Sequence, residues 1–367
     1  GRGMTDEPKI IQGAGGGGPK PPPPPYRAPD TLHSRSFATV QDLISEGEIE
    51  GFATASKAQL TKGTTAYDNA SLKDILLNDT PILDANASNS SPADTDFNFK
   101  DVVFKSKFGT SNQTAMSGIP AESRSPTGVG VIVTTSAPVT RQITNTDVDA
   151  VIVTLTWPQI QVAEDDGDLR GDTVEYKIQI QHDSGGFVDK VVSSVSGRTA
   201  DAYQKDHRIE LTSGFTTVDV RVLRVTADST ESNRVNAFQF TSLQEVIDNN
   251  STYANSAYTA LRFDSKQFNR IPTRKYRIRG VKVRIPGAGA SGTGTPTVDI
   301  QTGRIIYPSG YVFNGVMGAA VYTNCPAMCL LDLLTNTRYG LGNHIVDSNI
   351  DLFSFVAASK YANEEVD

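Results

Sequence analysis

The stretch Val151-Ile-Val-Thr-Leu-Thr-Trp157, followed by Pro158, decides the fold of the largest unit in this sequence. Residues 151, 153, 155 and 157 are large and apolar, which is the period of a strand with a buried face, and proline ends the strand because it cannot donate to a sheet ladder. The same alternation returns from Tyr176 to Ile180. About seven short strands over residues 147–243 predict a two-sheet sandwich, with Trp157 and Tyr176 as structural residues of its core.

The order of these strands resembles a fibronectin type III domain. Trp157 ends the second strand, an acidic turn follows at Asp165–Asp168, and Val-Glu-Tyr-Lys-Ile at 174–178 lies in the third strand. The tyrosine that normally marks the late corner of such a domain is absent near Val218. The unit is therefore fibronectin type III-like.

Short apolar runs broken by turn residues predict that the remaining chain is also mainly β. Residues 75–83 indicate two strands joined by a turn at Asn78-Asp79, and further strands are expected at 101–108 and 128–134. In residues 31–56, the spacing of Val40, Leu43 and Ile44 predicts one helical turn before a strand.

The run Tyr276–Ile285 alternates as a strand, but its apolar parity changes across Gly280, which predicts a β-bulge there. Its polar positions are all basic. They have three open interpretations: a solvated face, a contact with an acidic neighbouring chain, or a contact with nucleic acid. The residues concerned are Arg277, Arg279, Lys282 and Arg284.

The C-terminal residues 324–367 predict two helices. The first begins near Pro326, buries Met328 on one face and stops at Gly340. The second begins at Ser348 and is expected to bury Phe353, Val356 and Ala357. Cys325 and Cys329 are four residues apart, and because no second Cys/His pair accompanies them, two packed structural thiols are favoured over a metal site.

Residues 1–30 have the composition of a tail or an extended arm. Gly15–Gly18 is a flexible tract, and a polyproline stretch follows it. A disordered leader is one interpretation, and an arm lying against another tail protein or a neighbouring copy is the other. The residues proposed for that contact are Pro21, Pro22, Pro23, Pro24, Pro25, Tyr26, Arg27 and Asp30.

Composition restricts the function. The formal net charge of the 367 residues is −7, which disfavours a protein whose main task is to hold nucleic acid, and sequence-specific nucleic-acid binding is not expected. No apolar run approaches the length of a transmembrane helix. Two Cys and four His leave little material for a disulfide framework, a metal site or a catalytic cluster.

The sequence gives no sign of an enzyme. It has no phosphate-binding loop, no nucleophile elbow and no zinc-protease motif. Glu46, Glu48 and Glu50 indicate a solvated strand face more readily than a metal site, and Asp165–Asp168 indicates a polar turn more readily than a calcium loop. His182-Asp183-Ser184 contains triad residue types, but triads form in space and not along a strand end. We therefore expect no catalytic residue, no cofactor and no metal ligand.

Several segments, in the same order along the chain, resemble the N-terminal part of the host specificity protein J family, the tail tip proteins of lambda-like long-tailed phages. The Gly/Pro-rich leader before Ala28–Leu32 is also similar to that family. The matching segments are Asp42–Gly51, Arg141–Asp149, Glu245–Asp248, Thr259–Phe268, Ile271–Gly280, Tyr322–Cys329 and Arg338–Gly342.

This resemblance implies a multi-domain baseplate hub of β-barrels with an inserted fibronectin-like sandwich. It implies a trimer at the distal end of the virion tail, made in the host cytoplasm. The implied partners are distal tail proteins, the tail tube and tape-measure proteins, with the host receptor reached through downstream regions. The expected domains are an arm at 1–30, hub β-barrel parts at 31–146 and 244–323, the sandwich at 147–243, and the helical start of the next hub domain at 324–367.

The expected function is therefore that of a structural hub, which caps the tail tube and takes part in host attachment and genome ejection. Two alternatives stay open: a host-surface binding module, and a tail-associated cell-wall hydrolase. A hydrolase normally needs a paired carboxylate cleft or a Cys/His pair, and the sequence offers no such arrangement.

Overall fold

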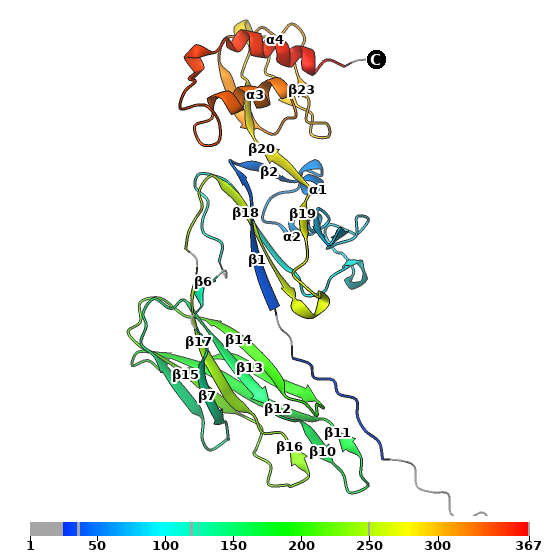
Figure 1. The fold of residues 1–367 in the computed structure, drawn as a ribbon, viewed down its shortest axis with the longest axis vertical. Coiled ribbons are helices and arrows are strands. Elements are labelled where there is room, and N and C mark those ends of the chain that lie inside the picture. Colours follow the sequence, from blue (N-terminus) through cyan, green and yellow to red (C-terminus); the bar gives the residue numbers. More distant parts are fainter. Residues whose placement is uncertain (1–24, 35–36, 118–119, 124, 249, 366–367) are drawn as a thin grey trace, which may run out of the picture.

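A computed structural model describes residues 25–34, 37–117, 120–123, 125–248 and 250–365. Figure 1 shows three units along the long axis: a β-sandwich, a middle unit of small sheets and short helices, and a C-terminal unit with two longer helices. Strands predominate over helices in the described residues as a whole, which confirms the mainly β class with a small C-terminal helical segment. Among the described residues, no helix is long and apolar enough to cross a membrane.

The sandwich consists of two antiparallel sheets, ordered β13-β12-β15-β8 and β14-β9-β17, with β6 and β7 both pairing with β17. The first sheet contains β8 (Val139–Ile143), β12 (Asp172–His182), β13 (Val188–Gly197) and β15 (Val218–Arg224). The second contains β6 (Pro120–Ser123), β7 (Thr127–Ile132), β9 (Ala150–Trp157), β14 (Tyr203–Glu210) and β17 (Gln239–Asp248). A small sheet extends one end: β10 (Gln161–Ala163), β11 (Leu169–Arg170) and β16 (Arg234–Val235).

The core of the sandwich is built from the inward-facing side chains of both sheets. Trp157 has no exposed surface, and its ring centroid lies 5.1 Å from that of Phe238 and 5.4 Å from that of Tyr176. Large aromatic side chains bury the most apolar area per residue, so each member of this cluster makes a large contribution to the hydrophobic stabilisation of the unit.

The sandwich begins earlier than residue 147, where the sequence analysis placed its start. Strand β8 pairs with β15, and β7 pairs with β17, so both belong to its sheets. Strand β7 contains Gly128 and Gly130 and is mostly exposed, and it therefore lacks the alternation that marks the other strands.

The main sheet of the middle unit has the order β1-β18-β5, from β1 (Phe37–Glu46), β18 (Ser256–Asp264) and β5 (Val103–Phe108). The helical turn predicted around Val40 is wrong, because this segment is part of strand β1. Leu43, one of the residues that suggested helical spacing, is 69% exposed, and the register shifts between Leu43 and Ser45.

Two small sheets and two helices complete this unit: β2 (Ile49–Phe52) with β20 (Ile278–Val281), and β4 (Thr80–Pro81), β3 (Ile75–Leu77) and β19 (Arg274–Tyr276), with α1 (Ala53–Lys57) and α2 (Thr65–Leu72). Asn78 and Asp79 have φ of 50° and 70°, so the predicted turn joins β3 and β4.

The described sheets here are open and have two or three strands, so the hub β-barrels expected from the family are not present as closed barrels. Helix α2 and short strands with different partners take the place of a continuous barrel wall.

The predicted strand Tyr276–Ile285 is divided among β19, β20 and β21 (Val283–Pro286). These strands pair with β3, β2 and β24, respectively. The change of parity therefore arises because the chain passes from one sheet to another, and the predicted bulge at Gly280 is wrong. A Cβ atom at Gly280 would meet nothing within 4 Å, so no close packing requires glycine there.

The C-terminal unit consists of two small sheets, β21 with β24 (Met317–Val321) and β22 (Thr297–Val298) with β23 (Ile305–Ile306), covered by α3 (Pro326–Thr335) and α4 (Leu352–Ala362). Helix α4 begins after Asp351, whose carboxylate accepts hydrogen bonds from the backbone of Phe353 and Ser354. The helix buries Val356, as predicted, together with Ser359, whereas Phe353 and Ala357 are exposed.

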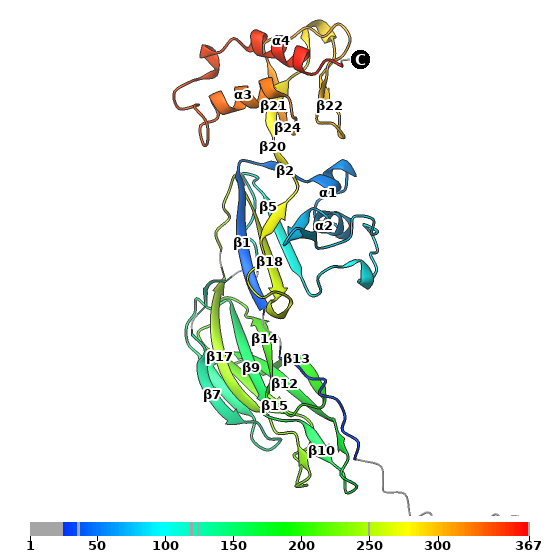
Figure 2. The same cartoon turned by 45° about the vertical axis from the view of Figure 1, so that its right-hand side comes forward.

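Four 3₁₀ turns lie in the described connections: η1 (Asp94–Asp96), η2 (Ser265–Gln267), η3 (Ala290–Gly292) and η4 (Asp347–Asn349). Figure 2, turned by 45°, shows the same succession of the three units.

Candidate interaction surfaces

The N-terminal arm lies against the sandwich of its own chain from Pro25 to Ser34. Arg27 forms a parallel bridge with Leu169, and the backbone N–H of Tyr26 donates to the carboxylate of Asp168 at 2.6 Å. The described part of the arm thus has contacts within its own chain, and contact of the arm with another tail protein or a neighbouring copy stays a prediction. Of the residues proposed for that contact, Pro21, Pro22, Pro23 and Pro24 lie outside the described residues, while Pro25, Tyr26, Arg27 and Asp30 are in the docked segment.

Two of the four basic positions are used inside the molecule. The Arg279 side chain is buried, lies 4.9 Å from the ring centroid of Tyr322 and donates to the carbonyl oxygen of Gln301 at 3.1 Å. The Lys282 ammonium is 2.7 Å from the carboxylate of Glu48. Burial of Arg279 is favourable only because these groups compensate for its lost hydration.

The other two basic residues lie on exposed positions. Arg277 donates to the carbonyl oxygen of Lys73 at 3.5 Å, and Arg284 is exposed on β21. The four residues therefore do not form one continuous basic row, because the strand that would align them is divided among three sheets. Contact with an acidic neighbouring chain remains a prediction for Arg277 and Arg284 only.

Three acidic residues of the middle unit lie near basic side chains from the segment that follows β20. They are Glu46, Glu48 and Glu50. The Glu46 carboxylate accepts a hydrogen bond from Nε of Arg338 at 3.0 Å, and Lys282 lies 3.7 Å from Glu50 in addition to its contact with Glu48. These pairs join the middle unit to the C-terminal unit. Each is partly exposed, so each contributes orientation more than stability.

The acidic turn of the sandwich brings three carboxylates together. Oxygen atoms of Glu164, Asp166 and Asp168 all lie within 4.8 Å of one another. Arg170 lies 3.1 Å from Glu164, and Asp168 also accepts the Tyr26 backbone N–H. The turn thus holds the arm and is balanced by a local cation, in accordance with the polar turn favoured from the sequence.

Tyr176 and His207 form a polar contact at the edge of the aromatic core. The Tyr176 hydroxyl oxygen lies 2.9 Å from Nε2 of His207. Burial, together with the nearby charge of Lys205, lowers the pKa of His207 to about 4. The imidazole is therefore neutral at physiological pH, and protonating it opposes folding.

The two cysteines do not share one environment. Cys325 is buried, and its Sγ lies 3.2 Å from Oγ of Ser359. Cys329 is exposed on α3, one helical turn further along, so the expectation of two packed thiols holds for Cys325 alone. The Cys329 Sγ atom is nevertheless partly covered, 3.9 Å from the carbonyl oxygen of Thr323, and this partial burial raises the pKa of the Cys329 thiol, which disfavours the reactive thiolate.

Two residues of the sequence-local triad, His182 and Asp183, have structural partners. His182 Nε2 accepts the backbone N–H of Thr212 at 3.3 Å. The Asp183 carboxylate accepts the backbone N–H groups of Thr216 and Thr217 at 2.8 and 2.9 Å. These contacts hold the turn after β12 against the start of β15.

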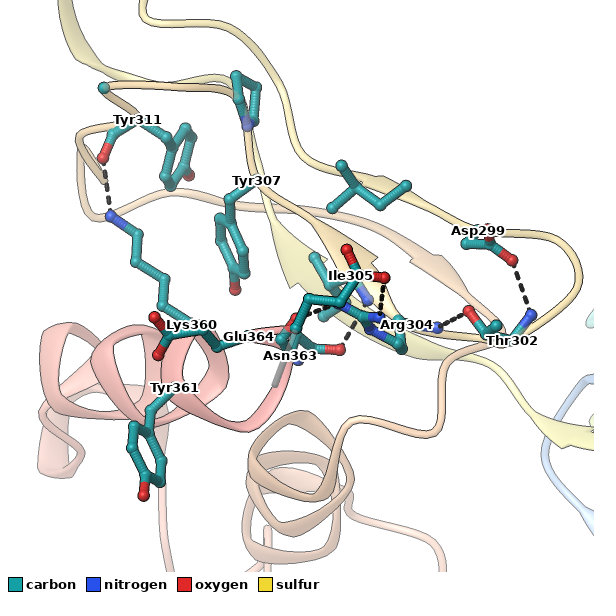
Figure 3. A pocket seen from close by; sticks show the side chains of 14 residues that line it. Asp299, Thr302, Arg304, Ile305, Tyr307, Tyr311, Lys360, Tyr361, Asn363 and Glu364 are labelled. Atoms are coloured by element: carbon teal, nitrogen blue, oxygen red, sulfur yellow. Dashed lines mark hydrogen bonds and ion pairs between the residues drawn. The ribbon is translucent and has the colours of Figure 1, made fainter. Parts of the chain in front are cut away.

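An open pocket of about 750 Å³ lies between β23 and the end of α4 (Figure 3). The Lys360 ammonium donates to the carbonyl oxygen of Tyr311 at 2.8 Å, and the Arg304 guanidinium donates to the carbonyl oxygen of Asn363 at 2.7 Å. Because these polar groups of the wall are paired with each other, we assign no ligand to the pocket.

Exposed apolar side chains are concentrated on the C-terminal unit, a feature that the sequence analysis missed. Leu330 and Leu333 on α3 are 50% and 49% exposed. The others in this unit are Ile306, Val312, Val316, Leu341, Val346, Phe353 and Tyr361. The helical pattern predicts the buried face of α3 but does not reveal that its outer face is apolar as well.

Comparisons with known proteins agree with the family resemblance. Residues 123–249 match the family described as tip attachment protein J, FNIII-A domain, a range that includes β7 to β17. Over 342 residues, or 92% of the chain, the sequence is 30% identical to tip attachment protein J of Escherichia phage SECphi4. Over 296 residues, or 80% of the chain, it is 28% identical to tip attachment protein J of Escherichia phage SECphi27.

The matched regions are 26% and 23% of those two proteins, so the chain spans about a quarter of the length of these curated relatives. Among solved structures, the receptor-binding domain of the spike protein P1 from bacteriophage PM2 aligns over 34% of this chain and 93% of its own, with 12% identity and a TM-score of 0.23, from which no inference follows. The chain is therefore a relative of tip attachment protein J over most of its length, and its residues 123–249 belong to the FNIII-A domain family of that protein.

Proposed function

We propose that this chain is part of the tail tip hub of a long-tailed phage. It acts as a structural protein that closes the tail tube and links it to receptor-binding elements during host attachment and DNA ejection. The observation that carries the proposal is the similarity of 92% of the chain to tip attachment protein J of Escherichia phage SECphi4.

The hub contains three copies of the chain, in contact with distal tail proteins, the tail tube and tape-measure proteins. The apolar outer face of α3 supports an assembled state, because contiguous exposed apolar surface normally marks an interaction site. On this face Leu330 and Leu333 lie three residues apart, and the backbone N–H of Leu341 donates to the carbonyl oxygen of Leu333 at 2.9 Å. The backbone of Leu341, a third exposed leucine, therefore lies next to that of Leu333.

The role is structural and not catalytic. The side chains with catalytic potential considered above have structural contacts: His182 and Asp183 hold a turn, and His207 belongs to the aromatic core. The names of the relatives also denote an attachment protein.

A second candidate function is direct binding of the host surface by the sandwich. It is favoured by β13, an edge strand with exposed Val188 and Val192 that could accept an added strand. Substituting both valines by lysine separates the two functions. If the chain is only a hub protein, phage with this variant assemble tails and adsorb normally. If the sandwich binds the host surface, the variant phage assemble tails normally but no longer adsorb.

The position in the virion tests the main proposal. An epitope inserted after Gly186, in an exposed turn where an added Cβ would meet nothing within 4 Å, keeps the sheets intact. Purified tails treated with gold-labelled antibody are expected to carry gold at the distal end only. Label along the tube, or virions without label although the chain is expressed, would refute the proposal.

A further inference from the structure

We propose that residues 25–34 are a strut: they dock on the surface of the sandwich of the same chain and fix the angle between the sandwich and the β1-β18-β5 sheet. The segment runs along the sandwich from the middle unit towards the β10-β11 end (Figures 1 and 2). The inference concerns this chain's own joint and does not depend on its position in a virion.

The two covalent connections between the sheet and the sandwich leave from one end of the sheet. Strand β5 ends at Phe108 and β18 begins at Ser256, and Phe108 pairs with Ala257, so both connections begin side by side. The side-chain amide of Gln113 in the first connection donates to the carbonyl oxygens of Thr252 and Tyr253 in the second, at 3.0 and 2.7 Å. The two connections therefore act as one joint, about which the sandwich could rotate.

The arm leaves from the opposite end of the same sheet. Phe37 pairs with Asp264, and Glu46, at the other end of β1, pairs with Ser256. A ten-residue strand rises about 33 Å, so the arm is attached about that far from the first joint. A third attachment at this distance removes the rotation that a single joint permits.

Backbone pairing holds the distal part of the arm. The N–H of Leu169 donates to the carbonyl oxygen of Tyr26, and the N–H of Ala28 donates to the carbonyl oxygen of Leu169, both at 2.8 Å. Pro25 lies over Gly167, where an added Cβ would be 3.2 Å from its ring. The arm therefore extends the edge strand β11, which is a recurrent mode of peptide recognition.

Arg198 is the sandwich side chain that contacts the middle of the arm. Its guanidinium donates to the carbonyl oxygen of Ala28 at 3.0 Å and forms an ion pair with the carboxylate of Asp30. The Arg198 side chain is 12% exposed, and the arm supplies both hydrogen-bond partners of its Nη1 atom, which helps to compensate for the burial of the cation. The N–H of Thr31 also donates to the carbonyl oxygen of Arg198 at 3.0 Å.

The proximal part of the arm packs against the sandwich core. Leu32 is half-buried against the core cluster and packs on Gly197, where an added Cβ would lie 3.1 Å from Cγ of Leu32. The hydroxyl oxygen of Ser34 accepts the backbone N–H of Gln204 at 2.7 Å. Apolar burial here adds to the backbone pairing and the ion pair farther along.

The segment that docks on this surface of the sandwich is the arm of the same chain. Ser34 contacts the sandwich and Phe37 is already in β1, and three residues span at most about 11 Å. An arm from a second copy could reach Ser34's position only if that copy placed its own β1 beside this sandwich. The short span therefore favours docking within one chain.

Tryptic cleavage after Arg27 measures docking in the full chain. The Arg27 side chain is exposed, but the peptide groups on both sides of it are paired with Leu169, so cleavage requires undocking. We expect Asp30→Ala/Leu32→Ser to accelerate this cleavage about tenfold, equivalent to about 1.4 kcal/mol. The matched control is His33→Ala, an exposed residue of the same segment, which should leave the rate unchanged.

The orientation is measured in the same variants with fluorophores on Ser213→Cys in the sandwich and Asn86→Cys in the middle unit, in a Cys329→Ser background. Both labelled positions are exposed. The unaltered arm should give one narrow distance distribution and the double variant a broad one. Fluorescence of Trp157, the only tryptophan, checks that the sandwich remains folded.

Three results would overturn the proposal. The first is cleavage after Arg27 that is as fast with the unaltered arm as in the double variant, because the arm would then be undocked. The second is accelerated cleavage with an unchanged distance distribution, because docking would then not fix the orientation. The third is cleavage that accelerates on dilution, because the arm of a second copy would then be the one that docks on this surface.

Discussion

The hydroxyl oxygen of Tyr176 lies 2.9 Å from Nε2 of His207, beside the ring of Trp157. His207 is 31 residues from Tyr176 in sequence, and the contact closes the polar edge of the aromatic core. Because burial favours the neutral imidazole, protonation of His207 at low pH destabilises the folded sandwich.

The stability of the sandwich should fall as the pH is lowered from about 6.5 to about 4. The pKa of His207 is lowered from 6.5 to about 4 in the folded state, so the unfolded state binds more protons in this range and protonation favours unfolding. We expect a loss of about 1–2 kcal/mol, because solvent at the half-buried ring reduces the full effect. Urea titrations followed by Trp157 fluorescence measure it, and His207→Phe should flatten this part of the profile. Equal pH dependence in both proteins would contradict the assignment.

Trp157→Ala should destabilise the sandwich by about 3–5 kcal/mol, because it removes a fully buried aromatic side chain. Trp157→Phe should cost only about 1–2 kcal/mol, since it keeps most of the ring contacts and removes the indole N–H, which has no hydrogen-bond partner among the described residues. Thermal unfolding followed by circular dichroism gives both values. Tyr361→Ala, at an 81% exposed position, is the control and should change stability by less than about 0.5 kcal/mol. A loss of less than 1 kcal/mol for Trp157→Ala would show that the core is packed differently.

Asp42→Asn should destabilise the middle unit by about 1–3 kcal/mol. The Asp42 carboxylate accepts two hydrogen bonds from Arg274, at 2.5 and 2.8 Å, and one from the Tyr276 hydroxyl at 2.6 Å, in a half-buried site. The Arg274 hydrogen bonds lower the pKa of Asp42, so this contribution is present above pH 4 and is lost as the pH falls further.

The control for this variant is Lys275→Ala, which removes the exposed ion pair between Lys275 and Asp79. We expect a change of no more than about 0.5 kcal/mol there. Equal effects of the two substitutions in urea unfolding at pH 7 would show that the Asp42 pair contributes no more than a surface pair.

Leu330→Lys and Leu333→Lys should leave folding intact and block tail assembly. Both side chains are about half exposed on the outer face of α3, so a charge is tolerated in the isolated chain but not in a buried interface. Complementation of a phage that lacks this protein, with electron microscopy of the tails, measures assembly. Val192→Lys, a comparable change on exposed β13, should assemble normally. Normal tails from the α3 variants would exclude this face from the interface.

The sandwich was predictable from the sequence because its strands alternate strictly. Period two fixes which side chains face inward, so Trp157 and Tyr176 could be placed in a core from local pattern alone. The same holds for Asn78-Asp79, because left-handed backbone suits these residue types at a hairpin turn.

Contacts between distant segments were not predictable in this way. Asp30 and Arg198 are 168 residues apart, and each alone has the pattern of a solvated surface charge. The alternation of residues 276–285 indicated strands correctly but could not show that successive parts join different sheets, because pairing partners are set by tertiary packing.

A three-dimensional reconstruction of purified tails tests the central claim most directly. Our account predicts three copies of this chain at the distal end, with the sandwich resolved as a separate unit and the outer face of α3 covered by a neighbour. A reconstruction with six copies, or with this chain absent from the distal end, would contradict it.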